Sequence, residues 1–479
     1  MAVAEPVFQE TAAPSGSFGE ARAMDIFTAL QTAVSGLKAQ AFSLDNISGN
    51  IANSQTTGYK RIDTSFVDLI AEQDPKHQVS GSVSAYSEMT NSIQGSLKGT
   101  GVATNMALNG DGFFVVQKKT TDSGGATNFS ASNLFTRRGD FAQDKDGYLV
   151  NGAGSYLSGA SLDPATGQTI SDGPIRISNG LLPAKATATI AYAANLPRTP
   201  TTTQAKINDG LLPAFAADRD ARVLSGTGTG KVDASDAQTL IDNSIGGPEL
   251  TVYTAAGAPV SLKTRWAKVA NASGDTKDTW NLFYADKPGV SGSQTGWTNL
   301  GQAFQFGASG QLSAPTGGTL TIPGLTIDNT PVASLTLDLS GGLTQYASSG
   351  GTATTSTLKQ DGYASGSLNV VEVGEDGVIR GTYSNGRTLD LARVQVVQFT
   401  NPDGLKADSL GNYQQTTSSG EPLVGLRNST VVGANVEQSN TDVAAEFSKM
   451  IVTQQAYSAN TRVMSTAQSM LSDLINVIR

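Results

Sequence analysis

Two stretches, one near each end of the chain, carry apolar residues at helical spacing. In the first, apolar side chains recur three and four residues apart after Asp25, at Phe27, Leu30, Val34, Leu37, Ala41, Leu44 and Ile51. Spacings of this kind, repeating every seven residues, predict a helix with a narrow seam for another helix. At about 1.5 Å per residue, a helix over residues 25–53 is about 43 Å long.

The second stretch occupies the C-terminus, with apolar residues at every seventh position: Val443, Met450, Tyr457, Met464, Leu471 and Ile478. Ser439, Asn440 or Asp442 can cap the start of this helix, and neither Gly nor Pro interrupts it. We expect the two seams to pack against each other or against neighbouring copies, rather than each lying on a globular core. Apolar flanks such as Ile47 and Ile451 exceed what one partner helix covers, so self-assembly is the expected source of further contacts.

The region between the seams has the pattern of strands broken by tight turns. Gly stands among aromatic and β-branched residues in "MALNGDGFFVVQ", 106–117, and "DGYLVNGAGSYL", 146–157, and the same texture returns at 377–399. Gly at such positions supplies the positive φ that hairpin turns need. The sequence therefore predicts a mainly β multidomain protein whose long helical termini form a coiled-coil core.

An insertion separates the strand-rich blocks, so the expected domains are nested and discontinuous. We expect a disordered extension at 1–23, with Met24 as a candidate start, and a helical core from 24–55 plus 437–479. An extended linker at 56–95 is expected to lead to a β-rich middle domain from 96–178 plus 363–436. A β-rich outer domain at 179–362 holds all three tryptophans, and its polar segment 199–248 indicates an extra subdomain.

Charge and cysteine content exclude several classes of function. A net charge of -9 and a pI near 4.8 give no basic surface for nucleic acid. No apolar run approaches the roughly 20 residues that cross a bilayer, and the N-terminus lacks the pattern of a secretory signal peptide. The chain has no Cys, and its one histidine, His77, lies in the polar segment "DPKHQVSGS". We therefore expect no disulfide, no thiolate metal site, no cysteine nucleophile and no catalytic or metal site built on histidine.

Two local patterns deserve comparison with alternatives. Asp140, Asp144 and Asp146 near Gly147 suggest calcium, but the ligands that complete an EF-hand loop are missing, and a hairpin turn explains the pattern better. Trp266, Trp280 and Trp297 permit a sugar-stacking surface on an extracellular β protein, although aromatic residues on strands more often form the core. Glycan binding therefore stays as an alternative function of a different class.

Read together, these segments resemble the bacterial flagellar axial family of rod and hook proteins. "NIANSQTTGYK", 50–60, is similar to the N-terminal signature of that family, "LNGDGFFVV" and "LFTRRGDFAQDKDGYLVNGAG" to its central blocks, and 447–479 to its C-terminal helix. The signature positions are Asn50, Ala52, Asn53, Thr57, Gly58 and Tyr59. The segments "TVYTAAGAPVSL" and "TWNLFY" resemble the outer domain that hook proteins carry and rod proteins lack.

The resemblance implies a structural subunit of the flagellar hook without catalytic activity or cofactors. Many copies would form a curved hollow tube that transmits torque from rod to filament as a universal joint. The implied partners are further copies of the chain, the distal rod protein, the hook cap protein, the hook-filament junction protein and the flagellar type III export apparatus. The implied location is outside the cell, after export through the flagellar channel. A distal rod or hook-filament junction protein is the alternative within the same system.

Overall fold

The computed structural model describes residues 17–69, 82–120, 127–164, 166–215, 220–223, 230–275, 277–287 and 289–478, so His77 lies outside the described residues. The chain divides into two compact units. The terminal unit comprises the described parts of Met1–Ser178, Val370–Gly381 and Thr388–Arg479. The inserted unit comprises those of Asn179–Asn369 and Thr382–Arg387.

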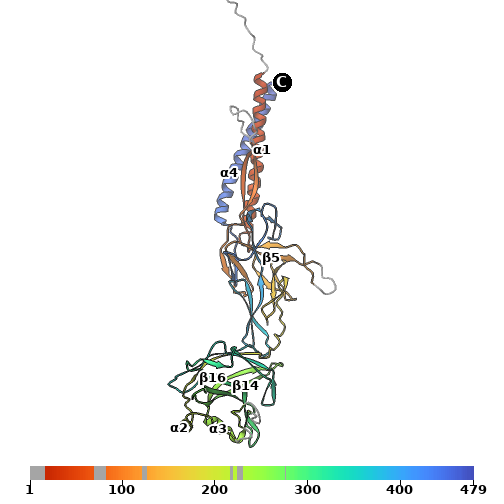
Figure 1. Ribbon diagram of the computed structural model, residues 1–479. Coiled ribbons are helices and arrows are strands. Elements are labelled where there is room, and N and C mark those ends of the chain that lie inside the picture. Colours follow the sequence, from red (N-terminus) through yellow and green to blue (C-terminus); the bar gives the residue numbers. More distant parts are fainter. Residues whose placement is uncertain are drawn as a thin grey trace, which may run out of the picture. The chain divides into compact units, whose positions relative to one another are not determined.

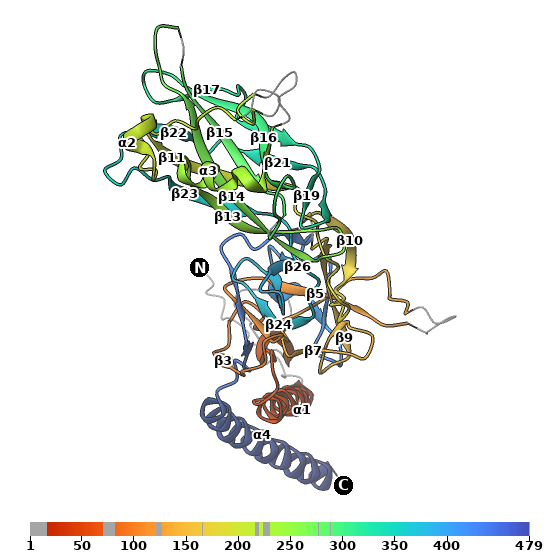
Figure 2. The same ribbon diagram turned by 90° about the horizontal axis from the view of Figure 1, so that it is seen from below.

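Two long helices belong to the terminal unit. Helices α1 (Ser17–Ala52) and α4 (Val443–Ile478) lie side by side and run antiparallel (Figures 1 and 2). Asp442 caps α4, because its side chain accepts hydrogen bonds from the backbone N–H groups of Ala444 and Ala445, at 2.9 and 3.2 Å. None of the described helices is long and apolar enough to cross a membrane.

Helix α1 begins earlier than the apolar pattern predicts. Its first residue is Ser17, so residues 17–23 are helical where the sequence suggests a disordered extension. The segment "GEARA", 19–23, consists mainly of good helix formers, which extend an existing helix without an apolar pattern of their own. The remaining residues of the expected extension, 1–16, lie outside the described part of the chain.

A hairpin follows α1 where the sequence suggests an extended linker. Strands β1 (Ile62–Leu69) and β2 (Ser82–Met89) pair antiparallel, from Ile62 opposite Met89 to Leu69 opposite Ser82. The hairpin also contacts α1, since the N–H of Val83 donates to Ser35 Oγ at 3.2 Å. Two extended segments satisfy their backbone polar groups by pairing with each other, a long-range effect that local sequence pattern does not reveal.

The β part of the terminal unit joins segments from both halves of the sequence. Its main sheet has the strand order β24-β25-β26-β9-β5-β6-β29-β28. Phe113, Phe135, Phe399 and Tyr413 pack edge to face in its core, with 4.8 Å between the ring centres of Phe135 and Phe399. The elements of this part are β3 (Leu97–Gly99), β4 (Met106–Asn109), β5 (Phe113–Lys118), β6 (Leu134–Thr136), β7 (Phe141–Gln143), β8 (Leu149–Asn151), β9 (Ser155–Leu162), β10 (Thr169–Pro174), β24 (Leu368–Val373), β25 (Val378–Tyr383), β26 (Thr388–Val394), β27 (Val396–Gln398), η2 (Pro402–Gly404), β28 (Lys406–Ala407), β29 (Tyr413–Gln414), β30 (Leu423–Val424), β31 (Thr430–Gly433) and β32 (Asn435–Glu437).

Two larger sheets of the inserted unit share one apolar core, to which the small β19–β20 sheet also contributes. One sheet has the order β18-β21-β11-β22 with β23 beside β11, and the other has the order β12-β16-β15-β14-β13 with β17 beside β16. Tyr192 of the first sheet stacks on Trp266 of the second, with 6.4 Å between ring centres. The elements are β11 (Thr189–Pro197), α2 (Ala205–Asn208), β12 (Lys231–Asp233), η1 (Ala234–Asp236), α3 (Ala237–Asp242), β13 (Ile245–Tyr253), β14 (Pro259–Ala270), β15 (Asp278–Ala285), β16 (Thr295–Phe306), β17 (Leu312–Ala314), β18 (Thr319–Ile322), β19 (Leu325–Ile327), β20 (Thr330–Val332), β21 (Leu335–Asp338), β22 (Leu343–Tyr346) and β23 (Thr354–Gln360).

The polar segment 199–248 covers a sheet of the inserted unit. Leu212, Val232 and Leu240 of this segment form a small cluster with Ala267 of β14 and Phe283 of β15. Helices α2 and α3 lie together on one side of β14 and β16 (Figure 1). In its described residues the segment thus contributes β12 and the start of β13 to the six-stranded sheet, and its other apolar residues, such as Leu212 and Leu240, pack on the strands.

Candidate functional site

The signature residues lie where the terminal helices meet the β part of the terminal unit. Helix α1 ends at Ala52, and the chain turns through Gly58 into β1. Asn50 and Gly58 are buried, Asn53, Thr57 and Tyr59 are partly buried, and Ala52 is exposed. The structure therefore brings five of the six into one packed junction.

Asn50 connects three elements at this junction. Its Nδ2 donates to the carbonyl of Ile62 at 2.9 Å and to Glu446 Oε2 on α4 at 3.0 Å. Its Oδ1 accepts from the N–H of Ile62 at 2.9 Å and from the hydroxyl of Tyr59 at 3.1 Å. With only 1% of Asn50 exposed, these bonds form away from water, where each group left unpaired costs about 1 to 3 kcal/mol.

Gly58 is required by the turn and by its surroundings. Its φ is 66°, a left-handed conformation that favours glycine. A Cβ at this position would lie 2.7 Å from the backbone nitrogen of Arg138 and 2.8 Å from the carbonyl carbon of Arg137. The N–H of Gly58 donates to the backbone carbonyl of Glu437 at 2.8 Å. Gly58 therefore allows the turn to pack directly against the segments that contain Arg137 and Glu437.

A buried ion cluster lies beside the turn. Glu437 is 0% exposed, and its two carboxylate oxygens contact Lys60 Nζ at 2.5 Å and Arg137 Nη1 at 3.3 Å. Lys60 also donates to the carbonyl of Ile93 at 2.6 Å, and the N–H of Gly95 donates to Glu437 at 2.8 Å. Since the three charges are satisfied together, removing Glu437 would leave two buried cations without their anion.

Burial governs the ionisation of this cluster. It lowers the pKa of Lys60, and Glu437 offsets part of that effect. Burial also raises the pKa of the Tyr413 phenol far above its usual 10.0, and the nearby Glu437 carboxylate acts in the same direction. The phenol of Tyr413 is therefore neutral at physiological pH.

Asn440 and Lys449 complete the junction from the C-terminal side. Asn440 Oδ1 accepts from the N–H of Arg61 at 2.8 Å, and its Nδ2 donates to Thr90 Oγ1 at 3.0 Å. Lys449 Nζ bridges Asp63 of β1 and Glu446 of α4, at 2.9 and 2.8 Å. Burial opposes ionisation of Asp63, but Lys449 and Arg61 outweigh it and hold the pKa of that carboxyl below its usual 3.8.

Two contacts define how the helices align. Asn50 meets Glu446, and Gly36 lies against Asn460, whose Nδ2 would be 3.0 Å from a Cβ at position 36. From the first contact to the second, α1 goes back fourteen residues and α4 goes forward fourteen. The helices therefore pair antiparallel in register over two seven-residue repeats.

The face of α1 that is buried within one chain lies one position from the predicted seam. Phe27 is 58% exposed, and Leu30, Val34, Leu37, Leu44 and Ile51 are only partly buried. The buried row precedes these positions and consists mostly of small or polar residues: Ala33, Gly36, Ser43, Ile47 and Asn50. Close packing of two helices favours small residues in the contact. A sequence pattern based on large apolar side chains therefore identifies the face next to the buried one. A role of the predicted seam in subunit packing stays a prediction.

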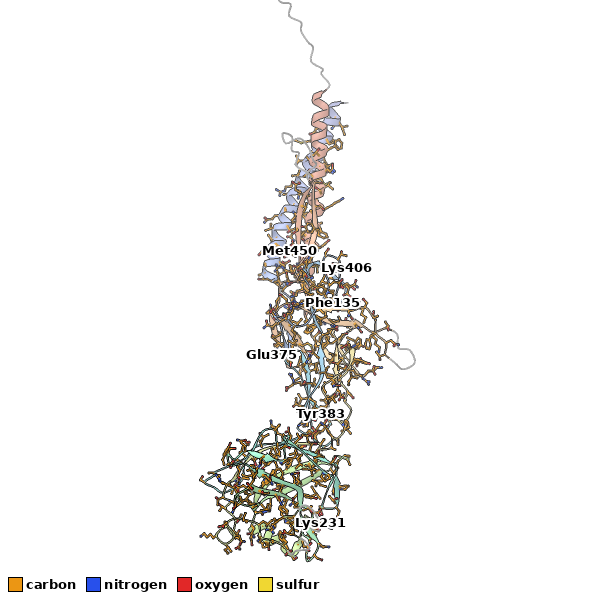
Figure 3. All side chains as sticks on the ribbon, in the orientation of Figure 1. Phe135, Lys231, Glu375, Tyr383, Lys406 and Met450 are labelled. Carbon is orange, nitrogen blue, oxygen red and sulfur yellow. The ribbon has the colours of Figure 1, made fainter. Side chains whose placement is uncertain are left out.

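On α4 the predicted apolar residues and the residues that are buried occupy alternating positions along the helix. Val443, Met450, Met464 and Leu471 are partly buried and Tyr457 is 40% exposed, while the side chain of Ile478 lies outside the described ones. Met450 lies at the end of the helix nearest the β part (Figure 3). The buried row stands three positions later, at Glu446, Thr453 and Ala467, and the partly buried Asn460 occupies the seven-residue position between the last two. The three buried residues escaped the apolar pattern because two are polar and the third is small.

The residues that sequence reasoning missed are mostly charged. Glu437, Arg137 and Glu446 stand in polar surroundings with no local signal that they are buried, and their partners lie hundreds of positions away. The suspected calcium segment is a turn, in which Asp144 Oδ1 accepts from the N–H groups of Asp146 and Tyr148 at 2.9 and 2.8 Å. Among the described residues, no group of three or more His, Cys, Asp or Glu is placed to hold a metal ion. The hydrogen bonds and ion pairs of the junction hold the two helices, the turn and β1 together.

Family models of flagellar axial proteins match four segments of the chain in order. They are "Flagella basal body rod protein" at residues 30–60, "Flagellar hook protein FlgE/F/G D1 domain" at 107–191, "Flagellar basal body protein FlaE D2 domain" at 223–363 and "Flagellar basal body rod FlgEFG protein C-terminal" at 433–477. The first and last include the two sides of the junction. The fold and the junction thus define a protein of the flagellar rod and hook class.

Whole-chain relatives narrow the class. The flagellar hook protein FlgE of Brucella abortus biovar 1 (strain 9-941) is 30% identical over 463 residues, covering 95% of this chain and 100% of the relative. FlgE of Salmonella typhimurium is 29% identical, covering 93% and 98%. The crystal structure of Helicobacter pylori flagellar hook protein FlgE2 covers 70% of this chain and 98% of its own, at 16% identity and a TM-score of 0.49. The chain belongs to the flagellar hook protein FlgE family.

Proposed function

We propose that this chain is a structural subunit of the bacterial flagellar hook and polymerises with many copies of itself. The observation that carries the proposal is the apolar surface that the helix pair leaves uncovered. On α4 alone, Phe447, Ile451, Val452, Val463, Met470 and Ile475 are each 49% to 65% exposed. Exposed large apolar side chains in this number indicate an interaction surface, and identical neighbours can supply its partner.

The helix pair supports a coiled-coil core of the polymer. Its two in-register contacts stand fourteen residues apart, which is two seven-residue repeats, and the large apolar residues Leu30, Val34 and Leu37 stand beside the buried row of α1. In the proposed tube, neighbouring copies cover these residues. Burying a Leu or Met side chain contributes about 1.5 to 3 kcal/mol, so a few such positions per subunit stabilise the assembly strongly.

The junction gives the proposed subunit a fixed connection between its helix pair and its β part. The ion cluster of Lys60, Arg137 and Glu437 and the bonds of Asn50 are buried, so rotation at this point breaks several bonds at once. We infer that bending of the hook as a universal joint occurs at contacts between subunits or at other points of the chain. The low charged fraction of 15% suits sliding contacts that depend little on salt.

The family also supports a set of partners and a location. We propose that the polymer begins on the distal rod protein, grows beneath the hook cap protein and ends at the hook-filament junction protein, outside the cell. Export through the flagellar type III apparatus accords with the absence of Cys from the chain. The subunit acts by assembly rather than by catalysis, and it uses no cofactor.

The alternatives have less support. A rod protein of this class would lack the inserted unit, whose residues 223–363 match the FlaE D2 model. A sugar-stacking surface needs exposed rings, but Trp266 and Trp280 are 0% exposed and Trp297 packs against a core cluster. These rings form the interior of the inserted unit.

Electron microscopy of cells that lack this chain tests the proposal. We expect basal bodies with a finished rod and no hook, and plasmid-borne wild type should restore the hook. Ile451→Lys should give a folded, secreted subunit that does not polymerise, whereas Gln454→Lys, at an exposed polar position of the same helix, serves as the matched control. A normal hook in the deletion strain would refute the function, and a normal hook from Ile451→Lys would refute the proposed packing surface.

A further inference from the structure

A small cavity lies next to the ion cluster in the terminal unit. Its volume is about 280 Å³, and its walls include Asn91, Ser92, Asp111, Phe113, Arg137 and Thr400. Asn91, Phe113 and Arg137 are 1%, 1% and 2% exposed and form the interior, while the other three residues are exposed. The cavity is therefore a pocket with a buried floor and a polar rim.

Two polar atoms of the floor have no hydrogen-bond partner among the residues that the structure describes. They are the acceptor Asn91 Oδ1 and the donor Arg137 Nε. The orientation of the Asn91 amide is fixed, because its Nδ2 donates to the carbonyl of Pro402 at 2.9 Å. The guanidinium of Arg137 is fixed by Glu437 on one side and by the ring of Phe113, 5.3 Å from its centre, on the other.

The charges around the floor are balanced. Glu437 contacts both Lys60 and Arg137, and the Asp403 carboxylate is close enough to act on Lys60 while accepting bonds from the N–H and hydroxyl of Ser92 at 3.0 and 2.8 Å. Two cations thus face two anions, and Asp111 at the rim adds a further negative charge. A bound anion would gain little net electrostatic attraction here, and a bound cation would be repelled by Arg137.

The unpaired atoms call for a neutral group that both accepts and donates. A carboxamide offers both functions, since its oxygen can accept from Arg137 Nε and its NH₂ can donate to Asn91 Oδ1. We propose that this pocket binds a carboxamide side chain, an Asn or Gln, from a second copy of the chain. The proposal rests on the hook function, which brings many identical, weakly charged surfaces together at high local concentration.

The chemistry of the pocket can be tested on the purified full-length subunit before assembly. Acetamide, acetate and acetamidinium have four heavy atoms each and differ in charge, and their binding is measured by saturation-transfer NMR. We expect acetamide to bind in the millimolar range, which is weaker than the affinity ceiling for very small ligands, and the two ions to bind at least about fivefold more weakly. Equal or tighter binding of acetate would overturn the proposal, as would no binding of acetamide, which would indicate a cavity that holds water only.

Substitutions locate the binding. Asn91→Leu keeps a similar size but removes the acceptor Oδ1, and it should weaken acetamide binding about fivefold or more. Thr400→Phe should block the rim while leaving Asn91 and Arg137 in place, so it decides the matter if Asn91→Leu does not fold. Thr430→Phe, at an exposed position of β31, is the matched control and should bind acetamide as the wild type does. Unchanged binding in Thr400→Phe would overturn the proposal.

The occupant is tested in the assembled tube. We expect a cryo-EM map of the polymer to show an Asn or Gln side chain of a neighbouring copy between Asn91 and Arg137, and acetamide binding to be lost on assembly. A pocket that holds only waters in the tube would refute the second copy as occupant. Failure of the chain to form hooks at all would refute the proposed function instead, and it would leave the acetamide result on the free subunit unaffected.

Discussion

Asn50 of α1 donates a hydrogen bond to Glu446 of α4 over 3.0 Å, although 396 positions separate the two residues in the sequence. Glu446 is 1% exposed and divides its two oxygens between Asn50 and Lys449. A buried carboxylate is stable only when it is paired, so this bond ties the alignment of the helices to the turn that follows α1. A polar residue at a helix seam is a known means of fixing register.

Replacement of Asn50 with Ala should loosen the junction. It removes four hydrogen bonds and leaves the partly buried Ile62 backbone and the buried Glu446 carboxylate poorly satisfied, so we expect a loss of about 2 to 4 kcal/mol in unfolding free energy. Denaturant unfolding of the purified subunit measures it. Asn133→Ala, whose side chain bonds Gln117 at an exposed site, should change stability by less than about 0.5 kcal/mol. Similar losses in both variants would contradict the role assigned to Asn50.

Neutralising Glu437 should be among the most damaging single changes. Glu437→Gln leaves Lys60 and Arg137 buried without an anion, and we expect a loss of about 3 to 5 kcal/mol. Asp390→Asn, which breaks the exposed pair of Asp390 with Arg380, should lose no more than about 1 kcal/mol. Adding Lys60→Met to Glu437→Gln should recover part of the loss, because one uncompensated cation is gone. A double-mutant cycle measures this coupling, and simple additivity would argue against a shared cluster.

Gly58 and Gly101 provide a matched pair. Both have left-handed φ angles, 66° and 72°, but a Cβ would collide with the backbone at Gly58 and would meet nothing within 4 Å at Gly101. Gly101→Ala should therefore lower the unfolding free energy only by the cost of a left-handed backbone at Ala, about 1 to 2 kcal/mol. Gly58→Ala should lower it by clearly more. Thermal unfolding compares them. Equal losses of stability would mean that the contact of the turn with Arg137 and Arg138 does not contribute to the requirement for glycine at position 58.

The helix contact predicts opposite effects of two glycines in α1. Gly49→Ala has open space around it and should stabilise the helix by up to about 1 kcal/mol, whereas Gly36→Ala would press on Asn460. The two variants should therefore differ in assembled tubes. From the seams we expect the helices of the free subunit to fray and to order on polymerisation, so there the two variants should resemble each other in circular dichroism. Strong amide protection of Leu37 and Met464 in the free subunit would contradict the fraying.

Acid should weaken the link between α4 and the hairpin. The folded pKa of Asp63 lies below its usual 3.8, so the pairing of Asp63 contributes stability above that value and loses it as pH falls through the folded pKa. Lys449→Gln should raise the pKa of Asp63 toward 3.8, as seen by NMR of its carboxyl carbon, and lower stability at pH 7 by about 1 kcal/mol or less. Lys263→Gln, in an exposed pair with Glu249, should leave the Asp63 titration unchanged. An unchanged pKa in Lys449→Gln would exclude that pairing.

The sequence predicted what depends on repetition and local turn chemistry. Both terminal helices follow from seven-residue spacing, and the mainly β region follows from Gly among aromatic and β-branched residues. The hairpin β1–β2 and the cover formed by 199–248 did not follow, because each depends on a partner distant in sequence. The signature positions Asn50 and Gly58 came from a family resemblance. Their neighbours Glu437 and Glu446 needed three-dimensional coordinates, since a buried Glu looks like a surface Glu in one sequence.

The distance along the chain between Lys60 and Glu437 has a consequence for the order of events in folding. Lys60 and Arg137 precede their shared anion by 377 and 300 positions. A partial chain that ends before Glu437 therefore contains two cations that burial would penalise, and the same chain lacks all of α4. The terminal unit can therefore close only when the last tenth of the polypeptide is present. A shorter chain cannot complete this unit and stays unfolded there, in a state that can still pass through a narrow channel.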